Sequence, residues 1–483
     1  MTNEPSPPAA PPAALPAAPP AALPAVLPGT ARALEHLLAR AQAEHRLPSV
    51  VAGLVRGGRL VWTGAAGTAV TDPAGEHLPD AAGTQYRIGS ITKTFVAAGV
   101  MRCVEDGLSA LDEPLRAHLP ELVGAGAGAL TVGQVLGQAS GLQAETDGPW
   151  WERTPGGDWR ELLPLLGPSA LRHRAGSRFH YSNVGYAVLG ELLGRLRGAR
   201  WDEVVAEQFL RPLGMARTTT RPQQPAARGF AVHPWADVLL PEPEHDAGAM
   251  APAGQLWSTV ADLARWAGVV ADGAGVLQPA TVEAMRRPQA VDDARGAAWS
   301  TGYGLGLQLW NAAGARAAGH SGSMPGFVAM LRVDVGTGDA VLALTNSTTG
   351  FGELPVRLLA ALAEAEPAAP RPWRPAPVDA DALELVGPWY WGPAPLVLRA
   401  RGDGSLELSG LAGRARSSRF VRDGAAGTWR GLDEYYAGEL LRVVRSADGA
   451  VSHLDLASFR LTRTPYDPGA DVPGGVDPTG WRP

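Results

Sequence analysis

The sequence predicts an α/β protein of the α+β type, in which helices flank an antiparallel sheet and a small β domain follows. Sheet elements occur at both ends of residues 29–365, and a large insertion of mostly helical pattern, about 110–295, separates them. A Pro-rich linker at 366–377 ends this first domain. Residues 378–465 then contain short segments of alternating polarity, typical of an antiparallel, barrel-like domain. A Gly- and Pro-rich flexible tail, 466–483, is expected last.

Residues 1–28 are rich in Pro and Ala and predict a flexible tail. They lack a basic start, and prolines interrupt each apolar stretch, so they do not have the pattern of a signal peptide. The sequence contains no run of about 18 apolar residues, so it predicts no membrane span. We therefore expect a cytoplasmic protein, although a wrongly assigned start codon would imitate such a tail.

The first domain is expected to begin with a helix and a hairpin. Thr30–Gln42 carries an apolar stripe of helical period, and its first residue is the expected N-cap. Strands are expected at Val50–Val55 and Leu60–Gly64, with Gly57 and Gly58 in the turn between them.

The other half of the sheet is expected near the end of this domain. Strand patterns occur at Gly302–Trp310, Phe327–Val335 and Ala340–Thr345, and a Gly-Thr-Gly hairpin signal joins the last two. A helix over Leu354–Ala365 closes the domain. In the C-terminal domain, strands are expected at Leu396–Ala400, Leu406–Leu408, Leu440–Val444, His453–Leu456 and Phe459–Leu461.

Composition argues against several classes of function. The formal net charge is −6 and no basic cluster stands out, so nucleic acid is not an expected partner. The single cysteine, Cys103, allows no intrachain disulfide and no Cys-rich metal site, and its apolar helical surroundings favour a buried thiol. His173 and His180 lack metal-ligand spacing. We therefore expect neither a metal nor another cofactor.

Lys93 is the only Lys among the 42 Lys and Arg residues. Because Arg serves wherever a permanent positive charge suffices, the single Lys indicates a place where Arg cannot serve. A desolvated Lys can lose its proton and act as a base, and Ser90 stands three residues earlier. The apolar period from Ile91 to Val104 predicts a helix that stops at Gly107, so Ser90 and Lys93 share a face of its first turn. A Ser beside a deprotonatable Lys is an activated nucleophile.

Two further motifs accompany this pair. Tyr181-Ser-Asn183 opens a helix-like run, in a chain with only four Asn. Gly319-His-Ser-Gly-Ser323 precedes the strand expected from Phe327, and an edge strand with small residues there could offer backbone N–H groups to a substrate.

Each motif also has a simpler interpretation. Tyr181 could be a core aromatic residue, Asn183 could cap the following helix, and His320 could be a surface residue in a Gly-rich turn. The spacing of Ser90 and Lys93 could be an accident. Several such coincidences in one chain are far less expected than one.

In this order the motifs resemble those of the penicillin-recognising serine hydrolases: class C β-lactamases, D-alanyl-D-alanine carboxypeptidases, D-aminopeptidases and related esterases. The family motifs Ser-x-x-Lys, Tyr-x-Asn and Lys/His-Thr/Ser-Gly match Ser90/Lys93, Tyr181/Asn183 and His320-Ser-Gly322. The resemblance covers about residues 30–365 and implies a β-lactamase/transpeptidase-like fold. Two positions depart from the family pattern. His begins the third motif, as in the peptidase and esterase members, and Gln138 replaces a usual His.

The resemblance implies a catalytic role for three residues. Ser90 would attack an acyl carbonyl after Lys93, neutral or sharing a proton with Tyr181, removes its proton. Tyr181 would protonate the leaving group and later activate the deacylating water.

It also implies a substrate-binding group. Asn183 would bind a substrate amide and orient Lys93, and His320 would tune the Tyr181 proton and contact a substrate carboxylate. Beside Gly322, the backbone N–H of Ser323 would hold the oxyanion together with that of the nucleophile.

We therefore expect a metal-free serine hydrolase that forms an acyl-enzyme on a small ester, amide or peptide. β-Lactamase or D-alanyl-D-alanine carboxypeptidase activity stays open, as does a slowly acylating or ligand-binding protein without turnover. The expected partner is a small-molecule acyl substrate, and no oligomeric state is predicted. Trp150, Trp151 and Trp159 would line an acyl pocket or pack helices, and the C-terminal domain would contribute no catalytic group.

Overall fold

The computed structural model describes residues 25–467 apart from 125, 297, 313, 370, 371, 374, 376, 378, 414 and 425. Most of the two expected tails and part of the expected linker lie outside the described residues. The chain divides into two compact units, Met1–Ala368 and Ala369–Pro483.

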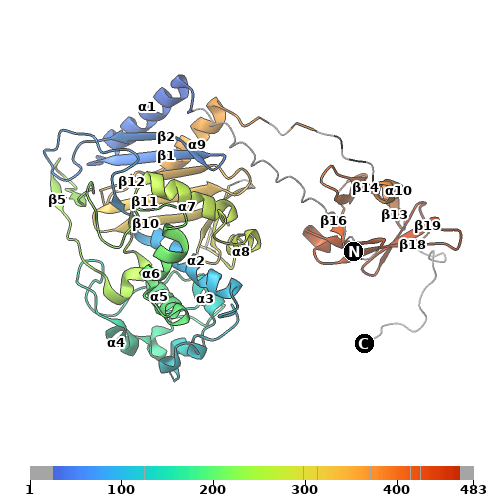
Figure 1. Cartoon of the computed structure of the whole chain (residues 1–483), viewed down its shortest axis with the longest axis horizontal. Coiled ribbons are helices and arrows are strands. Elements are labelled where there is room, and N and C mark those ends of the chain that lie inside the picture. The colour runs from blue at the N-terminus through green and yellow to red at the C-terminus, as the bar shows by residue number, and fades with distance from the viewer. Residues whose placement is uncertain are drawn as a thin grey trace, which may run out of the picture. The chain divides into compact units, whose positions relative to one another are not determined.

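An eight-stranded antiparallel sheet forms the centre of the first unit (Figure 1). The strand order is β2-β1-β12-β11-β10-β9-β8-β7, so strands from the start of the unit pair with strands from its end, as the sequence predicts. Val50 of β1, for example, pairs with Thr345 of β12. The strands are β1 Val50–Arg56, β2 Arg59–Ala66, β7 Ala290–Val291, β8 Thr301–Tyr303, β9 Gln308–Ala312, β10 Ala315–Met324, β11 Phe327–Asp334 and β12 Ala340–Thr345.

Helices cover both faces of this sheet. Alternate residues of β1 and β12 pack with α1, Pro28–Glu44, and α9, Leu354–Ala365, which lie side by side in Figure 1. The intervening residues belong to the larger core that contains α2, Thr92–Glu105, and α7, Val260–Asp272. Because both faces are buried, β1 and β12 are continuous apolar runs instead of alternating ones.

The insertion between β2 and β7 is mainly helical. Its longest helix, α5, is Asn183–Arg197, and most of its residues are buried against α2 and neighbouring turns. The other elements are α3 Val132–Leu136, α4 Trp159–Leu162, α6 Trp201–Val205 and α8 Pro279–Met285, with two small sheets formed by β3 Tyr86–Arg87 and β6 Trp257–Ser258, and by β4 Phe230–Val232 and β5 Leu239–Pro241.

Three sequence expectations need correction in this unit. Helix α1 begins at Pro28, so Thr30 lies within the helix and is not its cap; Pro suits the first helical position because the N–H that it lacks would have no helical partner there. The strand expected at Gly302–Trp310 is interrupted by a turn between β8 and β9. Strand β10 contains the third motif within it, although its Ala, Gly and Ser residues have low strand propensity.

The second unit is a closed eight-stranded antiparallel barrel. Its interior is filled with apolar side chains, among them Trp389, Leu408 and Trp429. The sequence missed three short strands, β13, β16 and β17, and helix α10. The elements are α10 Ala380–Leu385, β13 Gly387–Trp391, β14 Ala394–Ala400, β15 Leu406–Gly410, β16 Ser418–Arg422, β17 Thr428–Gly431, β18 Leu440–Arg445, β19 Val451–Leu456 and β20 Phe459–Thr462.

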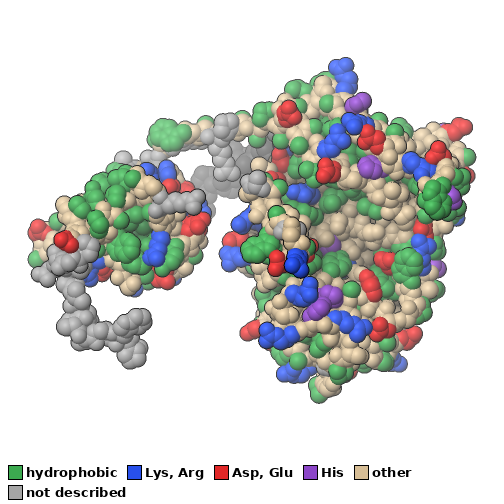
Figure 2. Space-filling view, turned by 180° about the vertical axis from the view of Figure 1, so that it is seen from behind, with side chains coloured by type: hydrophobic (Ala, Val, Ile, Leu, Met, Phe, Trp, Pro, Cys, Tyr) green, Lys and Arg blue, Asp and Glu red, His purple; other side chains and the backbone are tan. Residues whose placement is uncertain are grey.

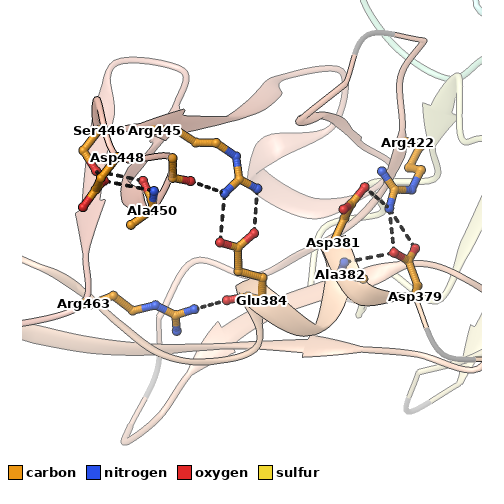
Figure 3. Close-up of polar contacts among 11 residues, drawn as sticks. Asp379, Asp381, Ala382, Glu384, Arg422, Arg445, Ser446, Asp448, Ala450 and Arg463 are labelled. Atoms are coloured by element: carbon orange, nitrogen blue, oxygen red, sulfur yellow. Dashed lines mark hydrogen bonds and ion pairs between the residues drawn. The ribbon is translucent and has the colours of Figure 1, made fainter.

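Arginine side chains tie α10 to the barrel (Figure 3). Arg422 donates to Asp379 at 2.8 Å, and Arg445 donates to both oxygens of Glu384, at 2.8 and 2.6 Å. Arg463 donates to the Glu384 carbonyl. The carboxylates at both ends of this short helix are therefore paired at the surface.

Candidate active site

Ser90 lies in the short 3₁₀ turn directly before α2, pressed against β10. Gly89 has a φ of 51°, a region that favours glycine, and a Cβ there would lie 2.5 Å from the Ser323 nitrogen. A Cβ on Gly322 would lie 1.9 Å from the carbonyl oxygen of the residue before Gly89. Two glycines thus let the turn and the strand meet backbone to backbone, which places the half-buried Ser90 beside the third motif.

Lys93 is fully buried, and its Nζ contacts three oxygens. Nζ donates to Asn183 Oδ1 and to the Ala253 carbonyl, at 2.6 Å each, and lies 2.9 Å from Ser90 Oγ. The first two oxygens can only accept hydrogen bonds, whereas the Ser90 hydroxyl can also donate. In the neutral amine, both N–H groups therefore go to Asn183 and Ala253, and the lone pair faces Ser90.

Burial lowers the pKa of Lys93 to about 7, because the charged ammonium loses its water. The negative charges of Glu145 and Glu152 oppose this shift. A substantial neutral fraction therefore exists near neutral pH, as a general base requires.

Tyr181 stands two residues before α5, and its hydroxyl is close enough to Ser90 for the serine to oppose the upward shift of the Tyr181 pKa. Lys93 Nζ lies 5.0 Å from the centre of its ring. Burial, and then the neighbouring Tyr303, raise the pKa of Tyr181 well above 10. Tyr181 therefore keeps its proton near neutrality, which suits a proton donor and leaves Lys93 as the better base.

Asn183 is the first residue of α5 and not its cap. Ser182 is the N-cap, because its Oγ accepts from the Gly185 nitrogen at 2.9 Å. The buried Gln138 fixes this motif, since its Oε1 accepts from the Ser182 nitrogen at 2.8 Å. Gln138, which replaces the usual His of the family pattern, therefore holds the backbone of the second motif in place.

His320 is a residue of β10, fully buried and in contact with Tyr303 of β8. Its Nδ1 lies 2.5 Å from the Ser321 carbonyl, which can only accept, so Nδ1 carries the proton and Nε2 accepts from the Tyr303 hydroxyl at 3.0 Å. Burial lowers the pKa of His320 to about 3, so the ring is neutral. With both nitrogens occupied, this geometry does not offer His320 to a substrate carboxylate. Tyr303, whose hydroxyl contacts His320, was missed in the sequence because no motif spacing marks it.

The Ser323 nitrogen lies beside the turn that carries Ser90. Two residues earlier on β10, the Ser321 nitrogen donates to Gln308 Oε1, on the side away from β11. Backbone direction repeats every second residue, so the Ser323 N–H points the same way. Strand β9 pairs with β10 only as far as Gly319, so the motif occupies a locally open edge. This edge and the Ser90 turn can together supply N–H groups to an oxyanion.

Glu145 is a second residue that the sequence did not single out. It comes from the loop before α4 and accepts from Asn183 Nδ2 at 2.6 Å. The buried Trp151 donates to its other oxygen, also at 2.6 Å. Trp150 is largely exposed, and Trp159 donates to Glu121 instead. Of the three Trp residues, Trp151 thus supports the site through a hydrogen bond.

No helix among the described residues is long and apolar enough to cross a bilayer. Within the same residues, no three His, Cys, Asp or Glu side chains gather in a way that could hold a metal ion. The face in Figure 2 shows acidic and basic side chains interspersed on both units.

Known proteins resemble both units. Residues 34–366 match the family described as Beta-lactamase, and residues 378–463 match a domain of unknown function, DUF7586. Penicillin-binding protein 4 of Amycolatopsis lactamdurans is 32% identical over 222 residues, which cover 41% of this chain and 58% of that protein. The matched segments span between 18% and 58% of the length of this and other curated relatives.

Solved structures give the same assignment. SurE with D-Leu is 26% identical, with a TM-score of 0.56, and covers 90% of this chain and 100% of its own. D-amino acid amidase from Ochrobactrum anthropi SV3 is 25% identical, with a TM-score of 0.55. The match covers 69% of this chain and 98% of the amidase. The fold and the family match over most of the chain agree that the protein belongs to the Beta-lactamase family.

Proposed function

We propose that this protein hydrolyses small amides or esters through an acyl-enzyme on Ser90, with Lys93 as general base and Tyr181 as proton donor. The observation that carries the proposal is the environment of Lys93. Its Nζ is buried, bound to two oxygens that only accept, and directed at the nucleophile.

The reaction would proceed in two halves. Ser90 Oγ adds to the acyl carbonyl while its proton moves to Lys93 Nζ, and the Ser90 and Ser323 N–H groups stabilise the oxyanion. Tyr181 protonates the leaving group as the acyl-enzyme forms, and Lys93 returns a proton to the tyrosine oxygen. Water then attacks the acyl-enzyme ester, and Lys93 accepts a proton from the water. This proton passes to Ser90 Oγ as the acid leaves, which regenerates Ser90.

For the substrate, we propose amide or ester derivatives of D-configured amino acids or short peptides. SurE with D-Leu and a D-amino acid amidase are among the structural neighbours at 25% identity or more. The neutral, enclosed His320 supports neutral amides and esters over compounds that require a cation for a free carboxylate. Cleavage of β-lactams is the second candidate, because penicillin-binding protein 4 is a relative.

A fluorophosphonate probe tests the acyl-enzyme chemistry. We expect stoichiometric labelling, with the modified peptide containing Ser90, and no labelling of Ser90→Ala. Steady release of p-nitroaniline from D-Leu p-nitroanilide, faster than from the L-isomer, would support turnover and the substrate class. Labelling without turnover of any amide, ester or nitrocefin would instead identify a slowly acylating binding protein.

A further inference from the structure

Glu145 connects two elements of the active site through its two carboxylate oxygens. Oε1 accepts from Asn183 Nδ2 at the start of α5, and Oε2 accepts from Trp151 Nε1, both at 2.6 Å. Trp151 is 7% exposed, so its indole has little freedom to move. The carboxylate is therefore held in place from one side and contacts the Lys93 partner from the other.

We propose that Glu145 is a positioning residue that fixes the orientation of the Asn183 amide and, through it, the lone pair of Lys93. This inference rests on the proposed function, because it concerns the base of that reaction. It adds a residue outside the three motifs to the machinery that activates Ser90.

The argument begins with the two ends of the Asn183 amide. Its oxygen only accepts and its nitrogen only donates, so the two orientations of the amide are chemically opposite. In the observed orientation, Nδ2 donates to Glu145 and Oδ1 accepts from Lys93. In the reversed orientation, Oδ1 would face the carboxylate and Nδ2 would face the Lys93 N–H groups. The carboxylate thus excludes the reversed orientation.

The consequence for catalysis follows from the geometry of Nζ. With Asn183 Oδ1 and the Ala253 carbonyl each taking one N–H, the lone pair of the neutral amine is left for Ser90. If the Asn183 amide adopted the reversed orientation, Lys93 would lose one hydrogen-bond acceptor and its amine could rotate away from Ser90. The rate of acylation would then fall without a large change in substrate binding.

Glu152 provides a matched control from the same loop. Its carboxylate also raises the pKa of Lys93, but it accepts from Trp150 Nε1, at 2.8 Å. It therefore exerts charge on Lys93 without contacting the Asn183 amide through that bond. Besides these two acids, the groups facing Lys93 are Tyr181, Tyr186 and the neutral His320.

Gln is the informative replacement at position 145. It keeps the size of the side chain, but it offers one accepting oxygen and one donating nitrogen to two donors, Asn183 Nδ2 and Trp151 Nε1. One of these two hydrogen bonds must be lost, and the Asn183 amide can then adopt the reversed orientation. Glu152→Gln removes an equal charge and leaves the Asn183 contact in place.

The experiment measures acylation by p-nitrophenyl acetate and inactivation by the fluorophosphonate over about pH 5 to 9, spanning the titration of the base. Both Gln variants should move the midpoint of the profile to lower pH, because each removes a negative charge that raises the Lys93 pKa. Only Glu145→Gln should also lower the maximal rate, by about tenfold or more, with KM changed much less. Circular dichroism and thermal melting verify that both variants fold.

A double-mutant cycle isolates the route through Asn183. In an Asn183→Ala background there is no amide to orient, so Glu145→Gln should cost less than about twofold. Equal maximal rates for the two Gln variants, or a full Glu145→Gln loss in the Asn183→Ala background, would overturn the positioning role while leaving the proposed function intact. If the folded wild-type protein is not labelled by the probe at Ser90, both the positioning role and the proposed function are contradicted.

Discussion

The barrel unit and the active site use basic side chains in opposite ways. Around α10, Arg422 and Arg445 meet carboxylates at a half-exposed surface (Figure 3). In the first unit, Lys93 is fully buried and its Nζ meets two neutral oxygens and a hydroxyl. An exposed charge keeps its water and a buried one does not, so only the second site changes the chemistry of its cation.

This difference explains the composition. An exposed pair needs a permanent charge and a planar donor, which Arg supplies, and 41 of the 42 basic residues other than His are Arg. A base must lose its proton near neutral pH, which Arg does not do. The solitary Lys therefore stands at the position where the proposed mechanism requires deprotonation.

The largest effect is expected when Lys and Arg are exchanged at the buried and at the exposed position. We expect Lys93→Arg to reduce fluorophosphonate labelling of Ser90 by at least about a hundredfold, because Arg keeps its proton. The matched control is Arg422→Lys, the reverse exchange at an exposed pair, which should leave the labelling rate unchanged. A Lys93→Arg protein that folds and retains more than about a tenth of wild-type activity, a loss below about 1.4 kcal/mol, contradicts the role of base.

Tyr181→Phe should slow amide hydrolysis by about 10²–10⁴, because it removes the proton donor and little volume. Burial keeps the pKa of Tyr181 high, so the wild-type donor is protonated over the working range. With p-nitrophenyl acetate the loss should be smaller, since nitrophenolate leaves without a proton. Wild-type rates with an amide substrate would rule out this donor.

The pH dependence should follow the amine. Since burial lowers the pKa of Lys93 to about 7, the acylation rate should rise with pH and reach half its maximum near that value. Below it the ammonium has no lone pair, and above it the neutral base predominates. A stopped-flow profile of acylation measures this midpoint, and a midpoint near 10 would mean that the amine is hydrated.

Removing the second unit should have a modest effect. A chain that ends at Ala368 retains all three motifs and the whole of the first compact unit. We expect it to melt cooperatively and to be labelled at Ser90 at a rate within about threefold of the full chain, with lower stability. If it folds but is not labelled, the barrel completes the active site.

The smallest effect is expected at the surface pairs. Arg445→Ala removes both hydrogen bonds to Glu384, but exposed ion pairs contribute little. Its melting temperature should fall by only about one or two degrees, with labelling of Ser90 unchanged. A large loss of labelling would show that α10 affects the active site.

Much of the fold could be predicted from the sequence because apolar patterns mark regular elements. The hairpin of β1 and β2 and helix α9 were predicted from such patterns and are confirmed, as is the barrel-like class of the second unit. The extent of strand β10 could not be predicted because small residues carry little strand preference, and its place in the sheet depends on pairing with β11. Local pattern does not contain that pairing.

The motif residues could also be predicted, and the structure brings Ser90, Lys93, Tyr181 and Asn183 together. Glu145 could not, because a carboxylate 38 positions from its partner Asn183 has no spacing that marks it. The neutrality of His320 likewise depends on its burial and on two hydrogen bonds that only the folded chain creates. Sequence motifs marked the candidate reacting groups, while the residues that support them could be identified only from the fold.

The buried amine of Lys93 also links folding to proton release. In an unfolded chain this amine would have its ordinary pKa of 10.5, whereas in the folded protein the pKa is about 7. Between these values the unfolded chain binds the additional proton, so folding expels it and the protein becomes more stable as pH rises. Below about pH 7 the full cost of burying the charge is present. The amine that we propose as the base for Ser90 is thus one whose burial lowers the stability of the fold.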